Sequence, residues 1–261
     1  MSITAEPSAL PSSGTVDLTG RTVVLVGDPG PLVRGIRSAL SRCGATVASV
    51  RQSRGRRFDA RDLGVAEPIP FDLVDQPTAR TGMTGIAEHH GGVDALVFAH
   101  VPAVATRPTA MADMTDEHWQ ASWEDTMRAM IYSLQAAYAQ FVKKTPPGGR
   151  FVVLIPAMAM TGGPGYGALA ATAEGQRLLM KSVARQWGPQ NVTANAITVA
   201  NSVLAPGAPD FEYSLAERAL GRTGDPDTDI GPVVSFLCSD LARFVTGTTF
   251  FCEGGLWMSA A

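Results

Sequence analysis

The chain has 261 residues, of which 45% are hydrophobic and 17% charged, with a formal net charge of −3. This length suits one α/β domain with a large core, and the mild negative charge argues against nucleic acid as a partner. No apolar run reaches the roughly 18–20 residues that span a bilayer, so no membrane association is expected.

The first 17 residues are rich in Ser, Pro and Thr and lack the basic and apolar regions of a secretory signal. We expect them to form a flexible tail ahead of a single domain over residues 18–261. The three cysteines have no metal-type spacing, so no metal site is expected, and their odd number is typical of a reducing cytoplasm. These features together predict a cytoplasmic protein.

Short apolar runs alternate with longer amphipathic stretches along the domain. The expected strands are Thr22–Val26, Thr46–Val50, Ala95–Ala99, Phe151–Ile155, Thr193–Val199 and Thr248–Phe251. The expected helices are Pro31–Cys43, Pro77–His90, Asp116–Val142, Gly167–Trp187 and Asp229–Ser239. Most of the runs are continuously apolar, as in strands buried on both faces of a parallel sheet. The pattern therefore predicts a doubly wound three-layer α/β/α fold that binds ligands at the carboxyl ends of its strands.

Gly27 and Gly30 follow the first expected strand and are candidate cofactor-binding residues. Glycines at this point let the backbone approach a phosphate at the start of a helix. The alternative is a plain strand–turn–helix connection, since Pro31 suits the first turn of a helix and has no N–H to offer a ligand. A Pro- and Gly-containing loop at Ser202–Glu212 is suited to be a mobile lid.

The second expected strand leads into an arginine-rich loop. Arg51 and Arg54 are candidate cofactor-binding residues, because arginines in a flexible loop suit the 2′-phosphate of NADP or the phosphates of a coenzyme A ester. No acid lies near Val50 to bind the ribose hydroxyls of NAD. NADP or a coenzyme A ester is therefore favoured over NAD if any cofactor binds. A solvated basic loop without a ligand is the alternative.

The last third of the chain carries four short motifs. They are Asn195-Ala196-Ile197, Gly221-Arg222-Thr223-Gly224-Asp225-Pro226, Val245-Thr246-Gly247 and Glu253-Gly254-Gly255. This series resembles the carboxyl-terminal half of the short-chain dehydrogenase/reductase family, and the resemblance extends over roughly residues 18–258. It implies a Rossmann-like fold and a scaffold built for NAD(P)-dependent hydride transfer.

The same resemblance implies that the catalytic positions are altered. The family's Ser, Tyr and Lys fall at Pro156, Leu169 and Ala173, and an Asn of the long helix falls near Thr126. Only the first of three family glycines remains, at Gly27, since Pro31 and Val33 take the other two positions. In the family, the Tyr is the general acid/base, the Lys lowers its pKa and the Ser polarises the carbonyl. Standard hydride transfer is therefore not expected.

Two other residues are candidates for a catalytic role. Tyr166 lies nearly one helical turn before Leu169 and could reach the cleft, although a surface or rim position is the favoured reading. His100 is expected at the carboxyl end of a central strand, where an imidazole can act as an acid or base or serve as a structural residue. We also expect Pro156, Leu169, Ala173 and Phe98 to line a pocket or plug with His100 at its floor.

Two hypotheses of function follow. The first is a non-catalytic (pseudoenzyme) subunit or small-ligand binder, alone or partnered with an active paralogue. The second is an enzyme, either an atypical NAD(P)-dependent oxidoreductase or a non-redox catalyst that uses Tyr166 or His100. Small residues on Asp116–Val142 and Gly167–Trp187, together with the intact segment Val245–Trp257, predict a homo- or hetero-oligomer, a dimer or tetramer.

Overall fold

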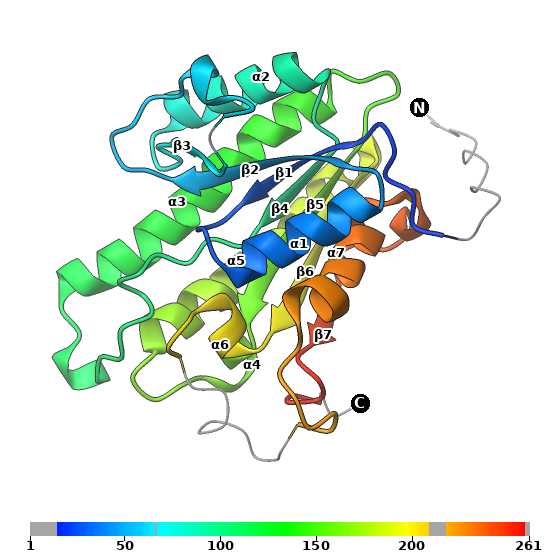
Figure 1. The fold of residues 1–261 in the computed structure, drawn as a ribbon. Coiled ribbons are helices and arrows are strands. Elements are labelled where there is room, and N and C mark those ends of the chain that lie inside the picture. The colour runs from blue at the N-terminus through cyan, green and yellow to red at the C-terminus, as the bar shows by residue number, and fades with distance from the viewer. Residues whose placement is uncertain (1–14, 66, 209–217, 259–261) are drawn as a thin grey trace.

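The computed structural model describes residues 15–65, 67–208 and 218–258, and these residues contain one seven-stranded sheet (Figure 1). The strand order is β3-β2-β1-β4-β5-β6-β7, and all neighbouring strands are parallel. The strands are β1 (Thr22–Val26), β2 (Thr46–Gln52), β3 (Ile69–Phe71), β4 (Ala95–Phe98), β5 (Gly149–Pro156), β6 (Val192–Val199) and β7 (Thr249–Cys252).

Helices cover both faces of this sheet and give the three-layer fold that the sequence predicts (Figure 1). The helices are α1 (Pro31–Arg42), α2 (Gln76–His90), α3 (Asp116–Phe141), α4 (Met158–Thr161), α5 (Gly167–Trp187), α6 (Asn201–Leu204) and α7 (Gly231–Cys238). The side chains of α2, α3 and α5 pack into one core cluster, and those of α1 and α7 pack into a second. The Rossmann-like α/β prediction is therefore confirmed.

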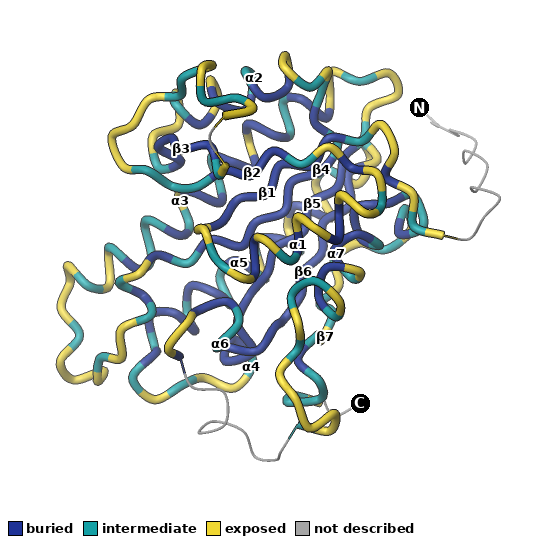
Figure 2. Tube along the Cα trace, in the orientation of Figure 1, coloured by how far each residue is buried: buried dark blue, intermediate teal, exposed yellow. Residues whose placement is uncertain are grey.

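The strands are buried as the continuous apolar runs predict. Every residue of β1, β4, β5 and β6 is buried, and Figure 2 shows this as an almost uniformly dark central sheet. Residues of each strand alternate between the two faces, so apolar side chains at consecutive positions feed both cores. The hydrophobic effect of these two cores is the main force that holds the sheet between its helices.

The helix boundaries agree with the predicted ones to within a residue, except before α7. The helix expected at Asp229–Ser239 is instead a π-helical turn, η4 (Pro226–Ile230), followed by α7. The Asp225 carboxylate accepts hydrogen bonds from the backbone N–H groups of Asp227 and Thr228, both at 2.9 Å. This cap begins the helical segment earlier than the apolar pattern does.

Strand β3 is not among the strands that the sequence predicts. It has only three residues and includes Pro70, so it shows no periodicity, and its position at the sheet edge tolerates a proline. Part of the expected lid, Ser202–Glu212, is helical in α6, and residues 209–217 lie outside the described residues. The same holds for residues 1–14 of the expected tail.

The sheet contains a topological switch point between β1 and β4. These two strands are neighbours, but the chain proceeds outward from β1 to β2 and β3 on one side and from β4 to β5, β6 and β7 on the other. Doubly wound sheets form a crevice at the carboxyl ends of the strands at such a point. Val26 pairs with Phe98 at these ends, so the residues just beyond them border the crevice.

Candidate functional site

Gly27 closes β1 and lies in a tightly packed position. Its N–H donates to the carbonyl of Val50 at 2.9 Å. A Cβ atom at Gly27 would lie 2.7 Å from Cγ2 of Val33 and 3.4 Å from the carbonyl oxygen of Ala99. The first contact is closer than real Cβ contacts allow. Gly27 is therefore needed for the packing of α1 against the strand ends, whether or not a cofactor binds there.

Gly30 is placed differently. It is the N-cap residue of α1 and has extended backbone, with φ −176° and ψ 179°. A Cβ atom there would meet nothing closer than 3.8 Å, so neither packing nor backbone strain requires a glycine. No side chain caps α1, and Pro31 at its first position has no N–H. The loop therefore offers a phosphate fewer donors than a glycine-rich loop would, and Val33 adds a side chain at the close approach.

His100 lies just beyond β4 and contacts the loop after β1. Its Nδ1 is 3.1 Å from Oδ2 of Asp28, and because a carboxylate only accepts, the imidazole N–H is the donor. The His100 side chain is 4% exposed, whereas that of Asp28 is 53% exposed. Nε2 of His100 is buried and has no hydrogen-bond partner in the described part of the chain. The imidazole is thus fixed in orientation with one ring nitrogen unused.

The arginines after β2 do not form one site. Arg54 is paired with Asp125 of α3, and Arg56 is paired with Asp62 at 2.8 Å. The side chain of Arg51, at the end of β2, has no ion pair or hydrogen bond with any described residue. The carboxylate of Asp72 holds this loop, since it accepts from Gly55 N at 2.6 Å. Arg51 is therefore the arginine of the two candidates that remains available to a phosphate.

The positions that the resemblance assigns to catalysis are all buried. Pro156 ends β5, and Leu169 and Ala173 lie one turn apart on α5 with exposures of 3% and 1%. Thr126 is buried in α3 and its hydroxyl donates to the carbonyl of Ser122 at 2.8 Å. None of these four side chains can exchange a proton in the neutral pH range. Their surroundings are those of a packed core.

Leu169 belongs to an apolar cluster at the carboxyl ends of the central strands. The buried members of this cluster are Ala105, Met158, Tyr166, Leu169, Ala170, Ala205 and Ala208. They come from the segments that follow β4, β5 and β6, together with the start of α5. We call this group the cleft cluster. It fills part of the region where the sequence analysis expected a pocket or plug.

Two predictions about residues at this end of the sheet are wrong. Phe98 and Ala173 pack in the core between the sheet and α2, α3 and α5, so they do not line one pocket with Leu169. Tyr166 is not a surface or rim residue, because it is the N-cap residue of α5 and is only 5% exposed. Four chain segments converge to bury it, and no local pattern encodes that.

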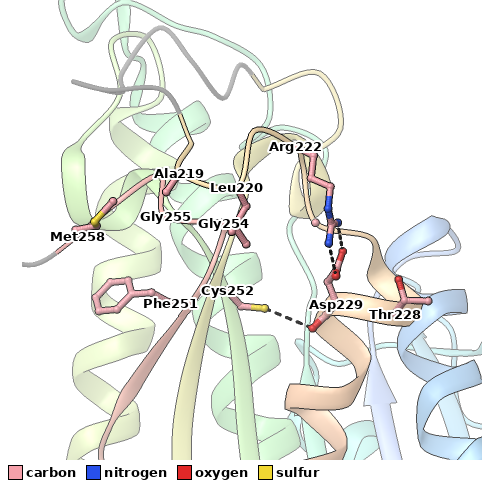
Figure 3. Close-up of a pocket in the computed structure, with 11 residues that line it drawn as sticks. Ala219, Leu220, Arg222, Thr228, Asp229, Phe251, Cys252, Gly254, Gly255 and Met258 are labelled. Atoms are coloured by element: carbon pink, nitrogen blue, oxygen red, sulfur yellow. Dashed lines mark hydrogen bonds and ion pairs between the residues drawn. The ribbon is translucent and has the colours of Figure 1, made fainter.

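A cavity that no sequence pattern predicts lies at one edge of the sheet, beside β7 (Figure 3). The cavity has a volume of about 560 Å³ and is lined by Ala219, Leu220, Arg222, Gly224, Thr228, Asp229, Phe251, Cys252, Gly254, Gly255 and Met258. Its polar side chains have partners: Arg222 donates to the Asp229 carboxylate, the Cys252 thiol donates to the backbone carbonyl of Asp229 at 3.7 Å, and the Thr228 hydroxyl donates to Asp225 at 3.1 Å. Burial raises the pKa of Cys252 to about 11.

A second hollow of about 600 Å³ lies against α2 at the opposite edge, lined by Phe58, Ala60, Leu63, Arg80, Thr81, Thr84, Gly85, Glu88 and His89. The three cysteines are free thiols. Within the described ranges, no group of three His, Cys, Asp or Glu residues is placed to hold a metal ion. No helix in those ranges is long and apolar enough to cross a membrane.

Comparisons with known proteins support the resemblance. The family model described as "Enoyl-(Acyl carrier protein) reductase" matches residues 32–257. The chain is 28% identical to an L-rhamnose 1-dehydrogenase (NAD(P)(+)) of Azotobacter vinelandii, over 93% of this chain and 98% of the relative. It is 27% identical to a 3-oxoacyl-(acyl-carrier-protein) reductase FabG of Haemophilus influenzae, over 93% of this chain and all of the relative.

Solved structures show the same fold. A putative short-chain alcohol dehydrogenase of Sinorhizobium meliloti superposes with a TM-score of 0.77 at 24% identity, covering 92% of this chain and 98% of that one. A short-chain type dehydrogenase/reductase of Mycobacterium ulcerans gives 0.74 at 22% identity, covering 92% and 90%. The chain belongs to the short-chain dehydrogenase/reductase family, an oxidoreductase family with a Rossmann-like fold.

Proposed function

We propose that this chain is a non-catalytic member of its family, acting as a subunit or small-ligand binder without standard hydride transfer. The observation that carries the proposal is the burial of Leu169 in the cleft cluster, at the position that the resemblance assigns to the acid/base Tyr. Hydride transfer to a carbonyl needs a proton donor beside the substrate oxygen. A leucine packed among alanines and Met158 supplies neither a proton nor room for a carbonyl.

The first loop supports the same proposal. A dinucleotide on this fold would place its pyrophosphate at the start of α1, against backbone N–H groups. Here Pro31 lacks a donor, Val33 is packed against Gly27, and the Asp28 carboxylate adds a negative charge beside the loop. These residues weaken the binding of a pyrophosphate here, compared with a glycine-rich loop. If a dinucleotide binds, we expect NADP to be favoured over NAD, because Arg51 is available at the end of β2.

The proposal includes an oligomer, formed with copies of this chain or with an active paralogue. Exposed apolar side chains on α3 and α5 support it, among them Trp119, which stacks on Trp123 at 6.1 Å between ring centroids, and Leu178, which is 63% exposed. Phe251 on edge strand β7 is 43% exposed. Light scattering at micromolar concentration tests this directly. A monomer would contradict both the oligomer and the subunit role.

The central experiment is an assay of NADH and NADPH turnover by the pure chain, using the substrates named for its relatives. We expect no rate above buffer with L-rhamnose or a 3-oxoacyl thioester, because loss of the general acid/base alone costs about 10²–10⁴ in rate. The double variant Leu169→Tyr/Ala173→Lys should also be inactive, since the phosphate loop remains altered. Robust turnover by the unmodified chain would overturn the proposal.

A second candidate is an atypical or non-redox enzyme that uses His100, and one observation favours it. The bond from Nδ1 to Asp28 leaves the lone pair on Nε2, which is how a general base is oriented. Activity that is lost in His100→Gln would support this candidate. Activity lost in Tyr166→Phe would instead assign the role to Tyr166, although that ring is buried in the cleft cluster.

A further inference from the structure

The crevice at the switch point is spanned by one pair of side chains. Val26 and Phe98 are paired across β1 and β4, and Asp28 and His100 each lie two residues beyond them. The 3.1 Å contact between Asp28 Oδ2 and His100 Nδ1 therefore joins the two sides of the crevice at its mouth. The two residues are 72 positions apart in the chain, so the contact links two separate loops.

The backbone beneath this pair is fixed. Gly27 N donates to the Val50 carbonyl at 2.9 Å, and Ala99 N donates to the Val26 carbonyl at 2.8 Å. His100 is also in edge-to-face contact with Phe98, with ring centroids 6.3 Å apart. The buried imidazole is therefore a rigid anchor, and the half-exposed carboxylate of Asp28 is held in one place by it.

The position of that carboxylate matters because of α1. This 12-residue helix begins at Pro31, three residues after Asp28, and no side chain caps it. The N-terminus of a helix attracts anions through its free N–H groups and its dipole. A carboxylate held beside it competes with any other anion, by charge and by occupying space.

We propose that Asp28 and His100 form a latch that closes the crevice against diphosphate esters. His100 holds the Asp28 carboxylate at the mouth of the phosphate-binding end of α1, and a diphosphate enters only when this hydrogen bond is broken. The proposal concerns ligand entry, and it does not depend on whether the chain transfers hydride. The activity assay and the binding test below can therefore fail separately.

The test is calorimetric titration with ADP, a nucleoside diphosphate that does not need the nicotinamide end of the cleft. Asp28→Asn removes the charge at a half-exposed position and should tighten ADP binding about 5-fold, the effect of roughly 1 kcal/mol from one charge at a helix N-terminus. Asp113→Asn, an equal change of charge at an exposed site in η2 (Met111–Asp113), should leave ADP affinity unchanged. Unchanged or weaker binding by Asp28→Asn would overturn the latch.

A double-mutant cycle separates the latch from simple removal of charge. His100→Ala should tighten ADP binding in the natural chain, because the carboxylate is no longer held, and should have no effect in the Asp28→Asn background. Hydrogen exchange of the amides of residues 27–33 should be faster in both single variants. Equal effects of His100→Ala in the two backgrounds would refute the latch. If His100→Ala does not fold, slower or unchanged exchange in Asp28→Asn would refute it.

Discussion

Two regions of this molecule differ in whether their motif positions hold hydrogen-bonded polar side chains or buried apolar ones. At the β6–β7 edge, motif residues hold the fold: Asn195 Nδ2 donates to the Val245 carbonyl at 2.9 Å and its Oδ1 accepts from Thr248 N at 3.3 Å. At the crevice, the positions that the resemblance assigns to chemistry hold Leu169, Ala173 and Pro156, which are buried and apolar.

The difference separates the parts of the family pattern that build the scaffold from the parts that act on a substrate. Asn195 is fully buried, and its two hydrogen bonds attach the loop before β7 to β6, so the sheet edge depends on it. Leu169 makes no polar contact and adds apolar surface to the fold. A polar catalytic group in that place would be expensive to bury without a partner. The apolar Leu169 avoids this cost.

The largest expected effect concerns the apolar packing at the crevice. Leu169→Ala should lower the free energy of unfolding by about 2–5 kcal/mol, the usual cost of removing a packed leucine side chain. Urea unfolding followed by circular dichroism measures it. Leu220→Ala, at a position 69% exposed, is the matched control and should change stability by less than about 0.5 kcal/mol. Equal, small effects of both substitutions would mean that the cleft cluster is not part of the core.

The second prediction concerns the hydrogen bonds of Asn195 at the β6–β7 edge. Asn195→Ala removes one hydrogen-bond partner from the Val245 carbonyl and one from the Thr248 N–H, and should cost about 1–3 kcal/mol, the usual net value of two hydrogen bonds. The same urea experiment measures it. Ser182→Ala, at an exposed serine of α5 whose hydroxyl only bonds its own helix, should be close to neutral. A neutral Asn195→Ala would show that this motif does not hold the edge.

The fold was largely predictable because it depends on local patterns. Apolar runs of four to eight residues and helical periodicity placed every strand except β3, whose three residues include Pro70. The start of the segment before α7 was missed because its cap, Asp225, lies outside the apolar pattern. These errors are all at short or capped elements, where the local signal is weakest.

The site was less predictable because it depends on contacts between distant residues. The position of His100 at a strand end follows from the sequence, but its partner Asp28 is 72 residues away and carries no signal of the pairing. The burial of Tyr166 likewise results from four converging segments. Arg51 and Arg54 are indistinguishable in the sequence, and only the ion pair of Arg54 with Asp125 separates them.

The third prediction follows from this difference between Arg51 and Arg54 and concerns the binding of a 2′-phosphate at the crevice. Arg51→Ala should weaken NADP binding by up to about 5-fold and leave NAD binding unchanged, the range expected for one exposed charge pair. Arg54→Ala is the matched control, since Arg54 already pairs with Asp125, and it should have the smaller effect. Calorimetry with both dinucleotides measures this. Equal weakening of NADP and NAD by Arg51→Ala would contradict a role at the 2′-phosphate.

The smallest effect concerns Glu253, a fully buried residue of the sheet edge. Burial raises the pKa of its carboxyl above the ordinary value, and the hydrogen bond from the Thr198 hydroxyl at 2.7 Å acts in the opposite direction. Oε1 has no partner among the described residues. Because the folded-state pKa is raised, the protonated form stabilises the fold at low pH, and this contribution is lost as pH rises through that pKa.

Glu253→Gln cannot ionise. The free energy of unfolding of this variant should therefore increase relative to that of the natural chain as pH rises from about 4 to 7. We expect a relative gain on the order of 0.5 kcal/mol, because the hydrogen bond from Thr198 offsets much of the cost of burying the charge. Urea midpoints at the two pH values measure it, with Glu88→Gln on α2 as the exposed control. If the urea midpoint of Glu253→Gln falls relative to that of the natural chain over this range, the folded protein stabilises the ionised carboxylate of Glu253. The unpartnered Oε1 would then not make its ionisation unfavourable.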